Sequence, residues 1–284
     1  MAFALLALIA IILLLREFPR LNRGGLVLRK ENSLRLTQQI IPRIIYRTAR
    51  GRNDLYKKAW NMTAKRNPEY RQVIYSDDDM EQFMKLHADP AVYNAFLRIN
   101  PKYGAARADI FRYAVLFSKG GVYLDAKSVA GRLANVIRPD DEMLLSKWPQ
   151  KYGHGEWLLC AQGTRDACQN GEYQQWWLAT RAGHPFLKTV LDGIVKRVSS
   201  YTRARYPPGK PSVIRLTGPK VFTLAVDRSI AAMAQGKYRR LRPNGDGVFQ
   251  YSAGIGWEHM KLYTHYSKLL DEEIVLSKKQ QYNN

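Results

Sequence analysis

The stretch Arg107–Ser128, RADIFRYAVLFSKGGVYLDAKS, decides the fold of this chain, because it joins a helical pattern to a short strand. Its apolar residues recur at the spacing of one buried helical face; they are Ile110, Tyr113, Ala114 and Phe117. We therefore expect a helix in the first half of the stretch, with this face packed against the core.

A diglycine at positions 120–121 ends that helix, since glycine tolerates the left-handed backbone found at helix C-terminal caps. Val122–Leu124 then predicts a short buried strand. Asp125 follows at the carboxyl end of this strand, and open α/β sheets bind their ligands at that edge. Asp109 and Arg112 lie three residues apart on the helix and can share a face. By themselves these two are also consistent with a helix-surface ion pair.

Strands and helices alternate on both sides of this stretch. The apolar, β-branched run Ile40–Tyr46 predicts a first strand, with Arg47 and Thr48 near its carboxyl end. Arg71–Tyr75 predicts a second strand, and capping residues after it start a helix that runs to about His87. The other expected elements are strands over 142–147 and 156–161, helices over 185–199 and 217–234, and a loop over 207–211. This alternation predicts an α/β fold with a largely parallel sheet covered by helices.

The composition is that of a globular protein with an unusual charge. The chain has 284 residues, of which 46% are hydrophobic and 24% charged, which suits one α/β domain. The formal net charge of +21 is concentrated in residues 16–71 and 195–242. Such a field attracts nucleic acid, acidic lipid head groups or phosphorylated substrates, and a merely solvated basic surface is the alternative. Nucleic acid is disfavoured, because the sequence carries no recognised binding motif for it.

The N-terminal segment predicts membrane attachment. Ala2–Leu15 is an uninterrupted apolar run, shorter than the roughly 20 residues that usually span a bilayer. We expect residues 1–15 to be an uncleaved single-pass anchor, with a signal peptide or an interfacial helix as alternatives. Residues 16–39 then form a basic linker, and residues 40–284 form the main domain.

The orientation in the membrane stays open. The basic flank after the apolar run favours a cytosolic domain, whereas the sequon Asn61–Thr63 is compatible with a Golgi or other endomembrane lumen. The two cysteines, Cys160 and Cys168, match no common metal or redox motif. The five histidines form no zinc signature.

Three motifs together resemble glycosyltransferase family 32, the group with a DXD sugar-binding region. They are IPRIIYRT at 41–48, DIFRY at 109–113 and GGVYLD at 120–125. The family includes fungal α-mannosyltransferases and inositol-phosphoceramide mannosyltransferases, and the resemblance covers about residues 40–266. It implies a GT-A-like, Rossmann-like fold and transfer of a hexose, with mannose favoured and the anomeric configuration retained. The implied donor is a GDP- or UDP-sugar, and the implied acceptor is a glycan or a phosphorylated lipid.

The resemblance also implies roles for individual residues. Arg47 and Thr48 would lie beside the nucleotide, Asp109 and Arg112 would hold the sugar and its diphosphate, and Asp125 would face the ribose or a metal. The donor-binding candidates are Arg47, Thr48, Asp109, Arg112, Tyr123 and Asp125. The catalytic candidates are Arg112, Asp125 and Lys127. Tyr113 and Tyr123 are at the same time expected in the core.

The sequence departs from the family motif at Lys127. The usual motif has two carboxylates, and the second is the main protein ligand of Mn²⁺ or Mg²⁺, whereas an ammonium cannot ligate a cation. Either Lys127 neutralises the donor diphosphate in place of a metal, or a metal stays bound to Asp125, His265 and phosphate oxygens. Reduced metal dependence is the favoured interpretation. The alternative function is a noncatalytic membrane protein that binds sugar nucleotides or anionic lipids.

Overall fold

The computed structural model describes residues 39–50, 54–149, 171–232, 236–252 and 268–277. The chain divides into two units, residues 1–37 and residues 38–284. The first unit, with the expected anchor and most of the expected linker, lies outside the described residues, as does the strand expected over 156–161. Within the described residues, no helix is long and apolar enough to cross a membrane.

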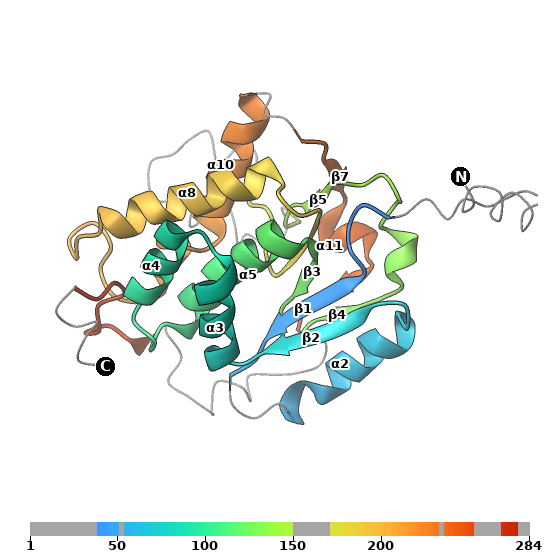
Figure 1. Cartoon of the computed structure of the whole chain (residues 1–284), viewed down its shortest axis with the longest axis horizontal. Helices are drawn as coiled ribbons and strands as arrows, with labels where there is room; N and C mark the ends of the chain where they lie inside the picture. Colours follow the sequence, from blue (N-terminus) through green and yellow to red (C-terminus); the bar gives the residue numbers. More distant parts are fainter. Residues whose placement is uncertain (1–38, 51–53, 150–170, 233–235, 253–267, 278–284) are drawn as a thin grey trace, which may run out of the picture. The chain divides into compact units, whose positions relative to one another are not determined.

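The second unit is built on a six-stranded sheet with the order β2-β1-β3-β6-β5-β7 (Figure 1). The strands are β2 (Arg71–Tyr75), β1 (Ile44–Thr48), β3 (Gly121–Leu124), β6 (Trp177–Thr180), β5 (Met143–Ser146) and β7 (Arg239–Leu241). All of them run in one direction except β6, which is antiparallel to both of its neighbours. A separate antiparallel pair consists of β4 (Val129–Ala130) and β8 (Phe249–Gln250).

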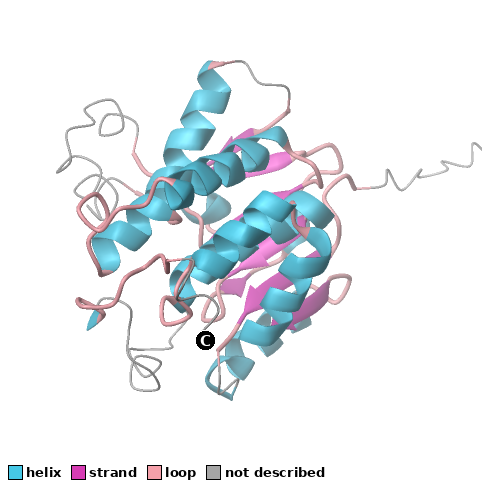
Figure 2. Cartoon of the chain, turned by 60° about the vertical axis from the view of Figure 1, so that its left-hand side comes forward, coloured by secondary structure: helices cyan, strands magenta, loops and turns pink. Residues whose placement is uncertain are grey.

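Helices cover the sheet, and most of them gather on one side of it (Figure 2). The helices are α2 (Asp54–Arg66), α3 (Asp77–His87), α4 (Pro90–Arg98), α5 (Gly104–Lys119), α8 (Pro185–Ser199), α9 (Lys210–Leu216), α10 (Pro219–Ala231) and the short α11 (Pro243–Asp246), with a 3₁₀ turn at Leu133–Asn135. Successive residues of a strand point to opposite faces of the sheet and so pack into different hydrophobic cores. Tyr46 and Tyr123 join the core under α3, α4, α5 and α8, whereas Ile45 and Val122 join the core on the opposite face.

The turn between α5 and β3 requires its two glycines. Gly120 and Gly121 have φ values of +66° and +110°. A Cβ on Gly120 would lie 2.6 Å from the backbone nitrogen of Ala182, and one on Gly121 would lie 2.8 Å from the carbonyl oxygen of Ile44. Because the chain reverses so tightly here, β3 returns along α5 and carries Asp125 back toward the middle of the helix.

The predicted α/β fold class, a mostly parallel sheet flanked by helices, is confirmed. Several boundaries differ from the prediction. The first strand begins at Ile44 rather than Ile40, after Pro42. The loop expected over 207–211 ends early, because Lys210 begins α9 with a proline in its first turn. The helix expected from residue 217 begins at Pro219 for the same reason.

Candidate active site at the carboxyl edge of the sheet

The strand directions collect polar residues along one edge. Because the parallel strands end together, Thr48 of β1 and Asp125 after β3 lie at the same edge of the sheet. Since β6 runs the opposite way, the residues before it, Gln175 and Trp176, approach this edge as well. The main-chain N–H of Asp125 donates to the carbonyl of Trp176 at 2.8 Å, which ties the two segments together.

Three predicted site residues meet at this edge. Nη2 of Arg112 lies 3.2 Å from Oδ1 of Asp109 and 3.4 Å from Oδ1 of Asp125. The helix and the strand therefore bring Asp109, Arg112 and Asp125 together as the sequence predicts. The Asp125 side chain is 25% exposed, whereas those of Asp109 and Arg112 are only 6% and 8% exposed. Asp125 is thus the member of the group that faces solvent.

Asp109 is held by the protein on all sides. Thr217 donates to its Oδ2 at 3.0 Å, and the Gln175 amide donates to its Oδ1 at 3.2 Å. Burial raises the pKa of Asp109 to about 6, and the charge of Arg112 and the Thr217 hydrogen bond oppose that rise. Because its oxygens are already occupied, Asp109 holds Arg112 in place.

Arg112 is a buried cation with several partners. Its Nη1 donates to the carbonyl of Gln175 at 2.8 Å, and its guanidinium lies 4.7 Å from the ring centre of Tyr123. Burial disfavours the charge, but Tyr123, Asp125 and Asp109 together raise the pKa of Arg112 above its ordinary value. The guanidinium is therefore a permanent positive charge directed at Asp125.

Arg47 fixes the turn that carries Asp125. Its side chain is fully buried, and its Nη1 donates to the carbonyls of Asp125 and Ser128, both at 2.9 Å. Its Nη2 donates to Thr63 at 3.0 Å. Burial lowers the pKa of Arg47 to about 9, which leaves the guanidinium charged at neutral pH. These contacts give Arg47 a positioning role, and its direct contact with a donor stays a prediction.

Thr48 and Tyr123 form a second, smaller contact at the edge. The Thr48 hydroxyl lies 3.1 Å from the Tyr123 hydroxyl, so the last residue of β1 is joined to β3. Tyr123 is buried as expected of a core residue, and burial raises its pKa to about 12. Tyr113, the other tyrosine expected in the core, is also buried and hydrogen-bonds the side chain of Gln175.

Lys127 lies at the solvent side of the same turn and is partly buried. Its ammonium lies 4.8 Å from the ring centre of Tyr251. Burial lowers the pKa of Lys127, and the charge of Asp125 opposes that change. The turn itself is held from the other side, because the Trp60 indole donates to the carbonyl of Ala126 at 2.8 Å.

The donor set at this edge fits a divalent cation poorly. Asp109 is saturated by Arg112, Gln175 and Thr217, which leaves Asp125 as the available carboxylate, with an ammonium two residues away. In the parts of the chain that the structure describes, no group of three or more metal-ligating side chains occurs. His265, the other predicted ligand, lies outside the described residues.

Two residues that complete the site were not predicted. Gln175 connects Asp109, Arg112 and Tyr113, and Thr217 caps the Asp109 carboxylate. The sequence gives no signal for Gln175, because it precedes a strand, whereas site residues of parallel sheets are expected after strands. Thr217 sits in a Thr-Gly-Pro run, which signals the start of a helix and weakly echoes the family but does not predict a contact with Asp109.

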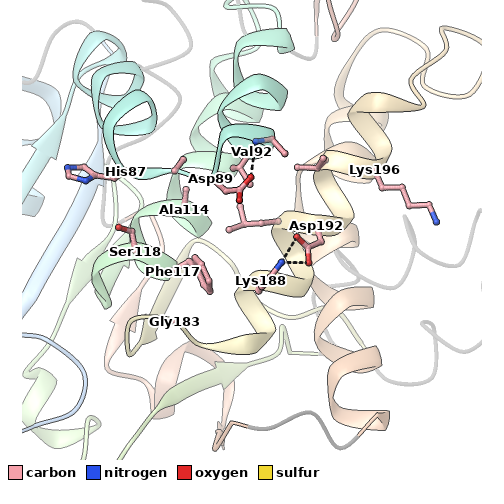
Figure 3. Close-up of a pocket in the computed structure, with 14 residues that line it drawn as sticks. His87, Asp89, Val92, Ala114, Phe117, Ser118, Gly183, Lys188, Asp192 and Lys196 are labelled. Atoms are coloured by element: carbon pink, nitrogen blue, oxygen red, sulfur yellow. Dashed lines mark hydrogen bonds and ion pairs between the residues drawn. The ribbon is translucent and has the colours of Figure 1, made fainter.

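A cavity lies away from this edge, between α3, α4, α5 and α8 (Figure 3). It measures about 630 Å³, and apolar residues such as Val92 and Phe117 line much of it. Lys188 at its wall is paired with Asp192 at 2.8 Å. α5 contributes Ala114, Phe117 and Ser118 to this cavity, all beyond Arg112 in the helix, and none of the candidate site residues lines it.

Comparison with known proteins identifies the segment around the site. Residues 53–144 match a family model described as the glycosyltransferase sugar-binding region containing a DXD motif. The match includes Asp109, Arg112, Asp125 and Lys127. It confirms the resemblance to the DXD glycosyltransferases that the sequence motifs carry.

Curated and solved relatives are similar over part of their length. The initiation-specific alpha-1,6-mannosyltransferase of Candida albicans is 24% identical over 192 residues, 59% of this chain and 45% of that protein. The mannosyl phosphorylinositol ceramide synthase of Saccharomyces cerevisiae is 32% identical over 89 residues, 31% of this chain and 22% of that protein. This chain thus spans less than half the length of these relatives. The solved PaToxG glycosyltransferase is 18% identical, covers 69% of this chain and 71% of its own, and has a TM-score of 0.46.

Proposed function

We propose that this chain, whose residues 53–144 match the DXD sugar-binding region, is a retaining hexosyltransferase that uses a nucleoside-diphosphate sugar. The observation that carries the proposal is the contact between Arg112 and Asp125 at the carboxyl edge of the sheet. The mannosyltransferase names of the curated relatives favour mannose as the sugar, and the donor in this proposal is a GDP- or UDP-sugar.

Asp125 is the side chain that contacts the donor in this proposal. Its carboxylate is partly exposed, and Arg112 holds it in one orientation at the edge. A fixed carboxylate accepts hydrogen bonds from the hydroxyl groups of a ribose or a hexose. Thr48, on the β1 side of Asp125, would contact the nucleotide, and Arg47 supports both through the backbone of the turn.

Lys127 stabilises the leaving group. Glycosyl transfer develops positive charge at the anomeric carbon and negative charge on the departing diphosphate. A preorganised cation stabilises that anion most effectively where water is excluded. The Lys127 ammonium is partly buried and close to Asp125 in the sequence, so it can place its charge on the diphosphate. Arg112 is too buried for this role and acts through Asp125.

The proposed reaction depends little on a divalent cation. Where the family motif has its second carboxylate, this chain has an ammonium, and Asp109 is already saturated by protein groups. A metal would have Asp125 and the donor's own phosphate oxygens as ligands, beside a repelling positive charge. The positive charge of Lys127 supplies part of the neutralisation that a metal gives to phosphates.

The acceptor in this proposal is a glycan or a phosphorylated lipid at a membrane surface. The formal net charge of +21 favours approach to anionic lipid head groups. Attachment through residues 2–15 would keep the domain at that surface, on either the endomembrane or the cytosolic side.

A transfer assay tests this function. The purified protein is incubated with radiolabelled GDP- and UDP-hexoses, with Mn²⁺ or with EDTA, and both donor hydrolysis and transfer to mannosides are measured. Asp125→Ala is expected to reduce turnover at least 100-fold, whereas Asp192→Ala, which removes an exposed carboxylate on α8, leaves it unchanged. Nucleotide-sugar binding without hydrolysis or transfer in the unchanged protein would instead establish the noncatalytic alternative.

A further inference from the structure

An aromatic cluster lies beside the candidate site and has no assigned role in the donor chemistry above; its Tyr251 is exposed, Trp148 is partly buried and Trp176 is buried. It consists of Trp148, Trp176 and Tyr251, and we call it the aromatic platform. We propose that the aromatic platform binds the pyranose ring of the acceptor sugar, with Tyr251 as the main contact. This inference rests on the proposed transfer function and adds the acceptor subsite to it.

The two tryptophans support the exposed ring of Tyr251 from below the surface. The ring centres of Tyr251 and Trp176 are 5.2 Å apart, and those of Tyr251 and Trp148 are 5.7 Å apart with perpendicular planes. Trp148 and Trp176 are themselves 6.3 Å apart. Trp148 is further fixed by hydrogen bonds with Glu172, one of them from its main-chain N–H at 3.0 Å. Tyr251 is thus held by two large neighbours from two separate segments of the chain.

Tyr251 is exposed where most large apolar side chains of the protein are buried. It is 42% exposed, and among the described residues the other exposed large hydrophobic side chains are Ile40, Leu86 and Leu270, which are aliphatic. Burying Tyr251 would be favourable for the folded chain, since aromatic side chains gain most from leaving water. A fixed aromatic ring left at the surface next to polar groups is the usual wall of a ligand site.

The aromatic platform lies on the side of Asp125 where we place the acceptor. The sheet order is β2-β1-β3-β6-β5-β7, so Asp125 after β3 lies between two groups of residues. The donor-binding candidate Thr48 belongs to β1 on one side. Trp176 and Trp148, which adjoin β6 and β5, lie on the other side. A donor bound on the β1 side leaves the aromatic platform free for the second substrate.

The aromatic platform reaches the reacting groups directly. The carbonyl of Trp176 accepts the main-chain N–H of Asp125 at 2.8 Å, and the Lys127 ammonium lies 4.8 Å from the Tyr251 ring centre. A pyranose ring has an apolar C–H face and polar hydroxyls at its rim. The π-face of a tyrosine is electron-rich and attracts the polarised C–H groups on the apolar face of the sugar. Asp125 and Lys127 can hydrogen-bond the hydroxyl groups at its rim.

Substitution of Tyr251 tests the subsite. Tyr251→Ala is expected to raise the KM for a mannoside acceptor at least tenfold, with donor KM and donor hydrolysis changed less than twofold. Tyr251→Phe keeps the ring and is expected to stay within twofold of the unchanged protein in every parameter. Leu86→Ala, which removes an exposed side chain on α3, is the matched control and is expected to change nothing. Thermal unfolding of each variant shows that the fold is retained.

Saccharide binding without donor separates this inference from the proposed transfer. Saturation-transfer NMR is recorded with methyl α-D-mannopyranoside, methyl α-D-glucopyranoside and methyl α-D-galactopyranoside. A signal in the unchanged protein that Tyr251→Ala abolishes supports the aromatic platform even if no transfer is found. Absence of binding to all three sugars, an unchanged acceptor KM in Tyr251→Ala, or weaker binding of GDP and UDP in that variant would each overturn the subsite and leave the transfer function standing.

Discussion

Arg112 reaches the carboxylate of Asp125 across 3.4 Å, although one residue belongs to α5 and the other follows β3. The diglycine turn between these elements makes the contact possible, because it sends β3 back along the helix. Asp109, one helical turn before Arg112, forms an ion pair with the same guanidinium, with 3.2 Å between its Oδ1 and Nη2 of Arg112. The partly exposed carboxylate of Asp125 is thus oriented by the buried pair of Asp109 and Arg112.

Replacing Arg112 with lysine tests this orientation. A lysine has one point of charge and cannot contact Asp109, Asp125 and the Gln175 carbonyl together. We expect kcat to fall at least tenfold and the free energy of unfolding to fall by about 3 kcal/mol, the usual cost of disrupting a buried pair. Steady-state kinetics and denaturant unfolding measure the two effects. Arg66→Lys at the exposed end of α2 is the control, and equal behaviour of the two variants would contradict the assignment.

Replacing Lys127 with aspartate restores the second carboxylate of the family motif. We expect the variant to need Mn²⁺, because it loses the cation that balances the diphosphate and gains a metal ligand. EDTA should then abolish its turnover, whereas it should reduce turnover of the unchanged protein less than threefold. Assays across a Mn²⁺ titration measure this difference. Strict Mn²⁺ dependence of the unchanged protein would show that Lys127 does not replace the metal.

Glu172 makes stability depend on pH near neutrality. Burial raises its pKa to about 7 from the ordinary 4.5, and a hydrogen bond with Trp148 opposes the rise. The folded state therefore favours the protonated form of Glu172. The contribution of this form to the free energy of unfolding is fully present below about pH 4.5 and is lost as the pH rises through 7. The loss is on the order of 3 kcal/mol.

Glu172→Gln keeps the hydrogen-bonding group but removes the titration. We expect the variant to have a higher melting temperature than the unchanged protein at pH 8 and an equal one at pH 4.5. Thermal unfolding across this range measures the effect. Glu69→Gln, on an exposed residue before β2, should show no such difference. A lower melting temperature of Glu172→Gln at pH 8 would mean that the ionised form is the one stabilised.

The stability cost of adding a side chain at Gly120, in the turn after α5, should come from steric overlap as well as from the backbone conformation. Gly120→Ala and Gly247→Ala both place a Cβ on a residue with positive φ. Gly247, with ψ of 2°, is left-handed, which costs about 1 kcal/mol, whereas Gly120, with ψ of −174°, lies in a region that essentially only glycine occupies and costs more. At Gly247 nothing lies within 4 Å of the new atom, whereas at Gly120 the backbone nitrogen of Ala182 lies at 2.6 Å. We expect Gly120→Ala to lose at least 2 kcal/mol more than Gly247→Ala, a difference typical of overpacking. Denaturant unfolding of the pair checks it, and equal losses would refute it.

Local patterns in the sequence predicted the parts of the fold that local physics determines. The helical face at Ile110 and Tyr113, the diglycine stop and the strand before Asp125 all occur as predicted. The sequence patterns did not predict helices α2 and α4. Strand β6 was also missed, because four buried residues beginning with Trp177 look like any short apolar segment.

The sequence predicted those residues of the candidate site that come from one continuous segment. Asp109, Arg112 and Asp125 lie within one helix-turn-strand unit, so their meeting follows from its geometry. Gln175 reaches the site because β6 is antiparallel, and strand direction is a long-range property that no short pattern encodes. The buried state of Arg47 was likewise invisible, since its partners Thr63, Asp125 and Ser128 come from separate elements.

The hydrogen bonds of Arg47 end on main-chain oxygens of the turn, not on the side chain at position 127. These bonds hold the course of the turn without using the side chain at position 127. The Lys127 side chain instead contacts the Tyr251 ring, whose centre lies 4.8 Å from the ammonium. We therefore expect a change of charge at position 127 to alter the chemistry of this edge more than the course of the turn beneath it.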